Sequence, residues 1–187
     1  MYQSIDEIKQ DYNSGKKLQF FLFWGHTPAK DGSVGAPCLS QWWQCSFSEN
    51  GTEYTSAEQY MMAGKACLFG DSEIFKQILE IRDPKYIKAL GRKVKNFDTE
   101  VWEASRLSIV KQGNLLKFSQ NEELSAFLIS TGDKIIVEAS PYDRIWGIGM
   151  GKENEFAENP LKWRGQNLLG FALMSAREEI RKNYRGC

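Results

Sequence analysis

A long stretch of helical sequence that no strand interrupts, residues 56–129, is the feature that most limits how this chain folds. A short apolar run at 18–25 predicts a buried strand before it, and a β-branched run at 134–139 predicts another after it. A last helix at 166–184 carries its apolar residues on one stripe, with charges opposite. Because strands and helices do not alternate, the expected class is α+β: a single mainly helical domain packed around a small sheet.

Turn residues and helix caps set the limits of the smaller elements. Two short strands at 42–48 and 52–55 are joined by Asn50-Gly51, a dipeptide that favours positive φ. Asp98 or Thr99 is expected to cap a helix that ends at Gly113. Further helical segments are expected at 1–16, 56–70, 74–81, 84–90, 114–118 and 122–129.

The chain has the size of one domain. We expect its 187 residues, 1–187, to form that domain, with 1–17 as an N-terminal helical extension. The 24 Lys and Arg residues balance 24 Asp and Glu, which excludes a general affinity for nucleic-acid backbone, since such affinity needs clustered cations. No apolar stretch reaches the roughly 20 residues of a membrane span, and the polar first residues lack the apolar core of a secretory signal. We therefore expect a cytoplasmic protein that does not bind membranes. Its oligomeric state is not predicted.

The cysteines and the single histidine argue against metal chemistry. Four cysteines are spread along the chain with no CxxC pair, and His26 has no second imidazole to join it. A Ser-His-Asp or Cys-His catalyst would have to use this one histidine. We expect neither a metal nor a cofactor.

The first candidate site is the helix within YTSAEQYMMAGKACLFGD, residues 54–71. Helical spacing places Glu58 and Lys65 on the same side as two methionines, an arrangement typical of a pocket wall. Thr55 and Glu58 also have the spacing of a capping box, in which the acid only satisfies a backbone amide. If Ser56 is the cap, Gln59 takes that place and Glu58 is available for chemistry. The sequence leaves both alternatives open.

The second candidate site is VEASPYDRIWGIGMG, residues 137–151. A buried strand is expected to deliver Glu138, and Asp143 and Trp146 follow within a few residues. Gly147 and Gly149 let backbone amides approach a phosphate or a sugar closely. A loop that needs positive φ explains the same glycines, so the two acids and the tryptophan carry the functional interpretation.

Several other residues are candidates for substrate binding. Arg92 belongs to a short basic run that is suited to a phosphate or is simply solvated. Asn167 stands near a helix start, as a cap or as a ligand for a polar group. Trp24 and Gly25 end the first strand, where a tryptophan beside a glycine suits stacking on a ligand better than a core position does.

Matching blocks run in order from about residue 20 to residue 181 and closely resemble the NADAR, or YbiA-like, family. They include FFLFWG, YTSAEQYMMAGKACLFGD, KALGRKVKNFD, VEASPYDRIWGIG and WRGQNLLGFALMSAR. The resemblance implies a YbiA-like fold and an enzyme that hydrolyses N-glycosyl compounds. It maps the family's acidic positions onto Glu58 and Asp143, and its basic and aromatic pocket positions onto Lys65, Arg92 and Trp146.

The expected activity follows from this resemblance. Family members are N-glycosidases that split the ribosyl C1–N bond of phosphoribosylamino-pyrimidine intermediates of the riboflavin pathway, a form of metabolite damage control. Others remove ADP-ribose from guanine bases, which would make a modified nucleic acid the substrate. A non-catalytic module that binds ADP-ribose or NAD is the third alternative. The carboxylates suit the first two, because cleavage of the bond develops positive charge on the ribosyl carbon.

Overall fold

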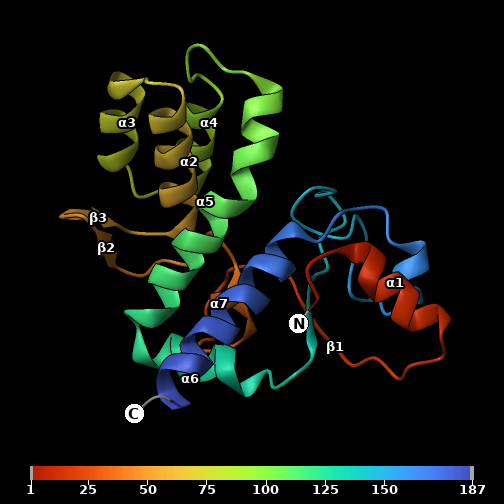
Figure 1. Ribbon diagram of the computed structural model, residues 1–187. Helices are drawn as coiled ribbons and strands as arrows, with labels where there is room; N and C mark the ends of the chain where they lie inside the picture. Colours follow the sequence, from red (N-terminus) through yellow and green to blue (C-terminus); the bar gives the residue numbers. More distant parts are fainter. Residues whose placement is uncertain (1, 186–187) are drawn as a thin grey trace. The chain divides into compact units, whose positions relative to one another are not determined.

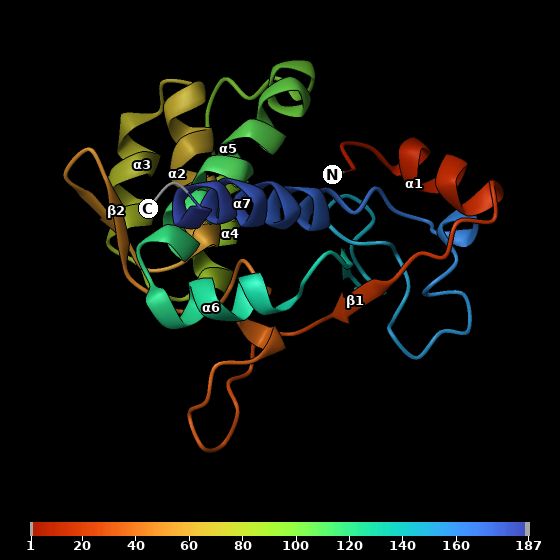
Figure 2. The ribbon, with the colours of Figure 1, turned by 60° about the horizontal axis from the view of Figure 1, so that its bottom comes forward.

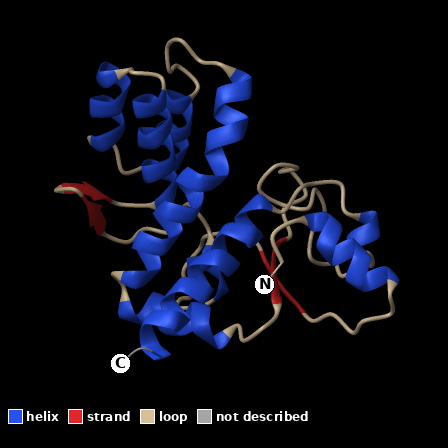
Figure 3. Cartoon of the chain, viewed as in Figure 1, coloured by secondary structure: helices blue, strands red, loops and turns tan. Residues whose placement is uncertain are grey.

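The computed structural model describes residues 2–185, and Figures 1 and 3 show that helices are its main regular structure. Contacts between residues divide the chain into two compact units. The first unit takes the segments up to Ser40 and from Glu123 onward, and the second is Gln41–Glu122. The expectation of a mainly helical α+β chain with little sheet is confirmed. No described helix combines the length and the apolar character that crossing a membrane requires.

A two-stranded parallel sheet organises the first unit. Phe20 of β1 lies opposite Ile135 of β4, and Phe23 lies opposite Glu138. The helix α7 packs on β4, so the predicted strands and the predicted last helix meet here. The elements of this unit are α1 (Ile5–Asn13), β1 (Phe20–Phe23), a 3-10 turn (Ala36–Leu39), α6 (Glu122–Ser130, whose first residue belongs to the second unit), β4 (Ile135–Glu138), a second 3-10 turn (Pro160–Lys162) and α7 (Leu168–Arg185).

A glycine allows α7 to approach β4 closely. A Cβ atom at Gly170 would lie 2.1 Å from the carbonyl oxygen of Ile136, which no real Cβ tolerates. The neighbouring Asn167 has a positive φ of 54° and is fully buried. The start of α7 is therefore fitted directly against the strand backbone.

One buried helix, α2, forms the centre of the second unit. It packs against α3, α4 and α5, as the helix group in Figure 1 shows. The β2–β3 hairpin lies beside this group in both views (Figures 1 and 2), with β2 against α5 and β3 against α2. The elements are β2 (Phe47–Glu49), β3 (Thr52–Tyr54), α2 (Ala57–Leu68), α3 (Ser72–Leu79), α4 (Pro84–Gly91) and α5 (Thr99–Ser119).

The predicted hairpin is confirmed with shorter strands. Asn50 and Gly51 have φ values of 50° and 80°, the positive values that a tight two-residue turn needs. Of the predicted first strand, 42–48, only Phe47 and Ser48 are paired, and 42–46 form turn and irregular structure instead.

The prediction that a helix ends at Gly113 is wrong. The helix α5 runs without interruption from Thr99, capped by Asp98, to Ser119. A Cβ atom at Gly113 would lie 2.5 Å from Cδ1 of Tyr60 in α2. The glycine therefore permits close packing of two helices and does not stop one, so the predicted piece at 114–118 is the last part of α5.

Candidate active site

The start of α2 decides between the two alternatives for Glu58. The Ser56 hydroxyl accepts a hydrogen bond from the Gln59 amide at 3.1 Å, so Ser56 is the cap. The side-chain Oε1 of Gln59 accepts from the Thr55 amide at 2.7 Å, and its Nε2 donates to the Ile78 carbonyl at 2.9 Å. Gln59 therefore does the work of the capping box, and Glu58 does not serve as the capping acid.

Glu58 belongs to a group of buried polar side chains, which we call the buried polar cluster: Gln41, Glu58, Asn114 and Lys117. The exposed fraction is 3% for Glu58 and 0% for both Asn114 and Lys117. The Glu58 amide donates to the Gln41 carbonyl at 2.9 Å, and the Asn114 side chain donates to Gln41 Oε1 at 2.9 Å. Lys117 lies one helical turn beyond Asn114 on α5. The cluster thus joins the start of α2, the segment before the hairpin and the end of α5.

Two amide atoms of this cluster have unmet hydrogen-bonding capacity. Gln41 Nε2 and Asn114 Oδ1 are buried and have no hydrogen-bond partner among the described residues. Leaving buried donors and acceptors unmet costs free energy, so such atoms are uncommon in folded proteins outside functional sites. One donor and one acceptor side by side match a polar ligand that carries both kinds of group.

Two cationic residues, Lys65 and Arg92, meet at the end of α4. Lys65 Nζ donates to the Gly91 carbonyl at 2.8 Å, and its ammonium lies 4.0 Å from the centre of the Phe97 ring. Burial lowers the pKa of Lys65 below its ordinary value. Arg92 is the next residue after Gly91 and its side chain is exposed. The structure therefore brings the two predicted basic residues together in the second unit.

In the first unit, the loop after β4 is held by Asp143. Its Oδ1 accepts hydrogen bonds from the amides of Ile145 at 2.8 Å and Trp146 at 2.7 Å. A Cβ atom at Gly147 would lie 2.7 Å from the Glu138 carbonyl oxygen, and Gly149 has a positive φ of 69°. The backbone geometry thus explains why both positions are glycine. The loop folds back onto the end of β4 and holds Asp143 in a fixed orientation.

An exposed aromatic pair stands beside this loop. The Trp24 side chain, 52% exposed, lies with its ring centre 6.2 Å from that of Tyr142, which is 88% exposed. Gly25, with a φ of 87°, turns the chain directly after Trp24. Large exposed aromatic faces are typical of stacking surfaces for flat ligands.

Asn167 holds the strand that carries Glu138. Its Oδ1 accepts from the Glu138 amide at 3.0 Å, and its Nδ2 donates to the Ile136 carbonyl at 3.0 Å. Both polar atoms of the Asn167 side chain therefore form hydrogen bonds with the backbone of β4. We expect it to position Glu138, while its predicted contact with substrate stays a prediction.

The predicted site residues form one group in each unit. Glu58, Lys65 and Arg92 lie in the second unit. The first unit holds the others: Trp24, Gly25, Glu138, Asp143, Trp146, Gly147, Gly149 and Asn167.

Sequence reasoning missed four residues: Gln41, Asn114, Lys117 and Tyr142. The false helix end at Gly113 hid the spacing of Asn114 and Lys117, three residues apart on one face of α5. A continuous helix over 99–119 would have shown Asn114 and Lys117 on the same face as the apolar Val110 and Phe118.

The described residues contain no group of three or more His, Cys, Asp or Glu side chains placed to hold a metal ion. His26 is exposed. The chemistry of the site is therefore argued from carboxylates, amides, cations and aromatic rings.

Comparisons with known proteins show what the whole chain is similar to. N-glycosidase R617 of Acanthamoeba polyphaga mimivirus is 49% identical over 156 residues, which are 81% of this chain and 92% of that protein. Riboflavin biosynthesis protein PYRR, chloroplastic, of Zea mays is 32% identical over 141 residues, 71% of this chain and 21% of that protein. The NMR structure of the E. coli protein YbiA matches with a TM-score of 0.69 at 22% identity, over 90% of each chain.

The structural match confirms the expected YbiA-like fold. The similarity to a named N-glycosidase over nearly its whole length makes the chain a hydrolase of N-glycosyl compounds at the level of reaction class. The NADAR domain matches residues 22–181, which cover the second unit and most of the first. The chain belongs to the NADAR domain family.

Proposed function

We propose that this enzyme hydrolyses the bond between ribosyl C1 and nitrogen in phosphoribosylamino-pyrimidine intermediates of riboflavin synthesis, and so removes damaged or reactive metabolites. The observation that carries the proposal is the buried polar cluster around Glu58. The naming of one relative as a riboflavin biosynthesis protein supports the substrate class.

Glu58 is proposed as the carboxylate that acts on the reacting sugar. Cleavage of an N-glycosidic bond develops positive charge on C1 and the ring oxygen, and a carboxylate in a site of low dielectric stabilises it strongly. The same group takes a proton from the attacking water. Glu58 is buried, and Ser56 and Gln59 perform the capping, so a role at the helix start does not account for a carboxylate at this position.

The other members of the cluster suit the leaving group. An aminopyrimidine carries both hydrogen-bond donors and acceptors, and Gln41 Nε2 and Asn114 Oδ1 offer one of each. The buried Lys117 ammonium adds the positive charge that favours departure of an electron-rich base. The pair Lys65 and Arg92 is proposed to bind the sugar phosphate.

Asp143 is the second proposed catalytic residue. Because two backbone amides hold its Oδ1, the carboxylate keeps one orientation without help from substrate. Such a preset group suits binding of ribose hydroxyls or orientation of water.

The removal of ADP-ribose from guanine is the second candidate. The exposed pair Trp24 and Tyr142 favours it, because a base within a nucleic acid offers a flat face for stacking. The balanced net charge disfavours it, since 24 cations face 24 anions. A module that only binds ADP-ribose or NAD has less support, because it needs Glu58 to be a mere cap.

A side-by-side turnover assay tests the proposal. One substrate is the phosphoribosylamino-pyrimidine intermediate, and the other is an oligonucleotide with ADP-ribosylated guanine. We expect release of ribose 5-phosphate from the first and little reaction with the second. Release of ADP-ribose from the second alone would replace the proposal with the second candidate, and binding of ADP-ribose without turnover of either would favour the module.

A further inference from the structure

We propose that the first unit carries a second binding site, separate from the N-glycosidase residues, for a small zwitterion of the amino-acid class. The site is a cavity of about 520 Å³, which we call the α1–α7 pocket. From α1 it is lined by Glu7, Gln10 and Asp11, and from α7 by Met174, Arg177 and Glu178. Its volume lies within the range of about 300–1,000 Å³ found for small-molecule sites.

The N-terminal extension builds one wall of this pocket. The family domain matches from residue 22 onward, whereas α1 spans Ile5–Asn13. None of the predicted N-glycosidase residues lines the pocket. One wall of the α1–α7 pocket therefore lies outside the matched family domain, and the pocket is separate from the predicted reaction residues.

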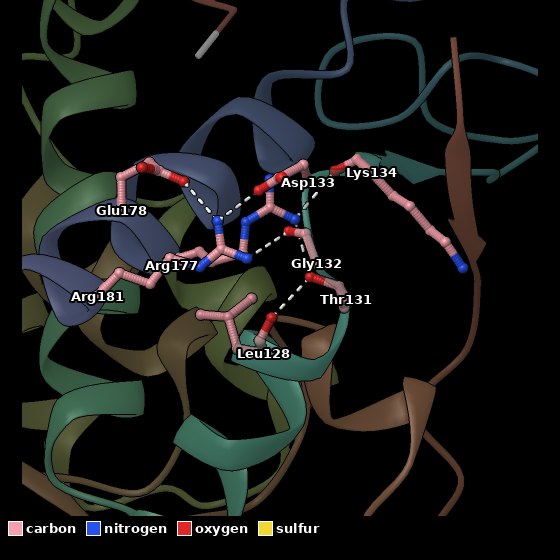
Figure 4. A network of polar contacts seen from close by, with 8 residues as sticks. All are labelled: Leu128, Thr131, Gly132, Asp133, Lys134, Arg177, Glu178 and Arg181. Carbon is pink, nitrogen blue, oxygen red and sulfur yellow. Dashed lines mark hydrogen bonds and ion pairs between the residues drawn. The ribbon is translucent and has the colours of Figure 1, made fainter. Parts of the chain in front are cut away.

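Arg177 is a buried cation on α7. Its side chain is 3% exposed, and its Nη1 donates to Thr131 Oγ1 at 2.8 Å and to the Lys134 carbonyl at 2.9 Å (Figure 4). Among the described residues, no acid forms an ion pair with it, and its buried Nε has no hydrogen-bond partner. Burial of a charge without a counter-charge is costly, so an anion from outside the chain would stabilise this position.

The nearest carboxylates are engaged by another arginine. Arg181 Nη1 lies 2.8 Å from Asp133 Oδ1 and 3.1 Å from Glu178 Oε1 (Figure 4). Nη1 makes both hydrogen bonds that the described part of the chain gives Arg177. The N–H groups of Nη2 are therefore left for a ligand carboxylate, while the neighbouring Nε is enclosed by protein atoms.

The remaining charges of the pocket determine the other end of the ligand. Four carboxylates line it: Glu7, Asp11, Asp133 and Glu178. Lys16 forms an ion pair with Asp11, and Arg181 forms ion pairs with Asp133 and Glu178. Glu7 is therefore the carboxylate placed to attract an ammonium group, and the four acids together disfavour a doubly charged phosphate. A molecule that carries both a carboxylate and an amino group satisfies both walls.

NMR titration of the whole chain tests this site with L-lysine as the probe. We expect L-lysine to shift the Arg177 Nε–H resonance and the amides of α1 and of α7 around residue 177. Two matched probes each lack one charge: hexanoate has no amino group, and cadaverine has no carboxylate. Both should bind about tenfold more weakly than L-lysine or worse.

A variant that fills the pocket provides the control without touching Arg177, whose loss endangers folding. Gln10 is exposed on α1 and lines the cavity, so Gln10→Trp should abolish the shifts while Gln10→Ala keeps them. N-glycosidase turnover should be unchanged in both, which separates this site from the proposed function. The proposal is overturned if L-lysine leaves the Arg177 resonance in place, if inorganic phosphate shifts it more strongly than L-lysine, or if Gln10→Trp binds as well as the native chain.

Discussion

At the scale of single residues, Glu58 carries the strongest prediction. Glu58→Gln keeps the size of the side chain and removes its charge, so the structure of α2 should persist. We expect kcat to fall by roughly 10²–10⁴, the usual contribution of a general acid or base, with little change in melting temperature. Steady-state kinetics and thermal unfolding measure the two effects.

The control for this variant is Glu53→Gln, which changes an exposed acid of β3 in the same unit. It should leave kcat and the melting temperature close to those of the native enzyme. Native-like turnover of Glu58→Gln, or an equal loss in both variants, would contradict the role proposed for Glu58.

Tyr60 gives a prediction about pH. Its hydroxyl donates to Glu49 Oε2 at 2.7 Å, and burial together with this carboxylate raises its pKa well above the ordinary value of 10.0. Since the folded pKa is raised, the contribution of Tyr60 to stability is fully present below about pH 10 and is lost as the pH rises further. Urea denaturation at about pH 8 and pH 11 measures this effect. Between these two pH values, the free energy of unfolding should fall less for Tyr60→Phe than for the native protein. Equal losses would mean that Tyr60 titrates alike in the folded and unfolded states.

At the scale of elements, two glycines set how closely helices pack. Gly113 of α5 faces the Tyr60 ring, and Gly170 of α7 faces the Ile136 carbonyl of β4. The sequence alone does not distinguish a glycine that ends a helix from a glycine that allows a neighbouring element to pack closely. Only the partner across the contact distinguishes them, and that partner is distant in sequence.

Gly113→Ala should therefore lower the free energy of unfolding by about 1–3 kcal/mol, the usual effect of overpacking. The cause is a Cβ atom placed 2.5 Å from the ring of Tyr60. Ser108→Ala, an exposed change on the same helix, serves as the control and should have little effect. Urea denaturation measures both, and a native-like midpoint for Gly113→Ala would show that α2 and α5 have room to separate.

Gly170→Ala should destabilise the fold more, because its Cβ would meet a backbone carbonyl, which cannot move aside by a change of rotamer. The comparison is Gly151→Ala, where no atom lies within 4 Å of the added carbon. We expect a fall in melting temperature of several degrees for the first change and almost none for the second. If both variants melt together, the contact of α7 with β4 is looser than the distances indicate.

At the scale of the whole molecule, the prediction of a single domain over 1–187 concerns cooperativity. The two strands of the parallel sheet come from either side of the second unit in the sequence. We expect far-UV and near-UV circular dichroism to report one coincident unfolding transition. Two separate transitions would mean that the units fold as independent domains.

The sequence predicted the class of fold and the hairpin turn, and it offered the observed caps Ser56 and Asp98 each as one of two alternatives, because these depend on local chemistry. Local patterns and then the resemblance to a family also made Glu58 and Asp143 candidates for catalysis, which stays a prediction. The sequence could not find Gln41, Asn114 and Lys117, because their burial arises from helices that meet only in the folded chain. Nor could it separate the structural use of Gly147 from a functional one, since the Glu138 carbonyl that fills its space becomes its neighbour only after folding.

The pairing of β1 with β4 has a consequence for synthesis on the ribosome. Phe20–Phe23 emerge early, but their partners Ile135–Glu138 follow only after the whole second unit has been translated. At roughly 5 to 20 residues per second, that delay is on the order of ten seconds. During this time the nascent chain exposes an apolar, aromatic strand edge, which is a natural place for a chaperone to bind until the last helix arrives.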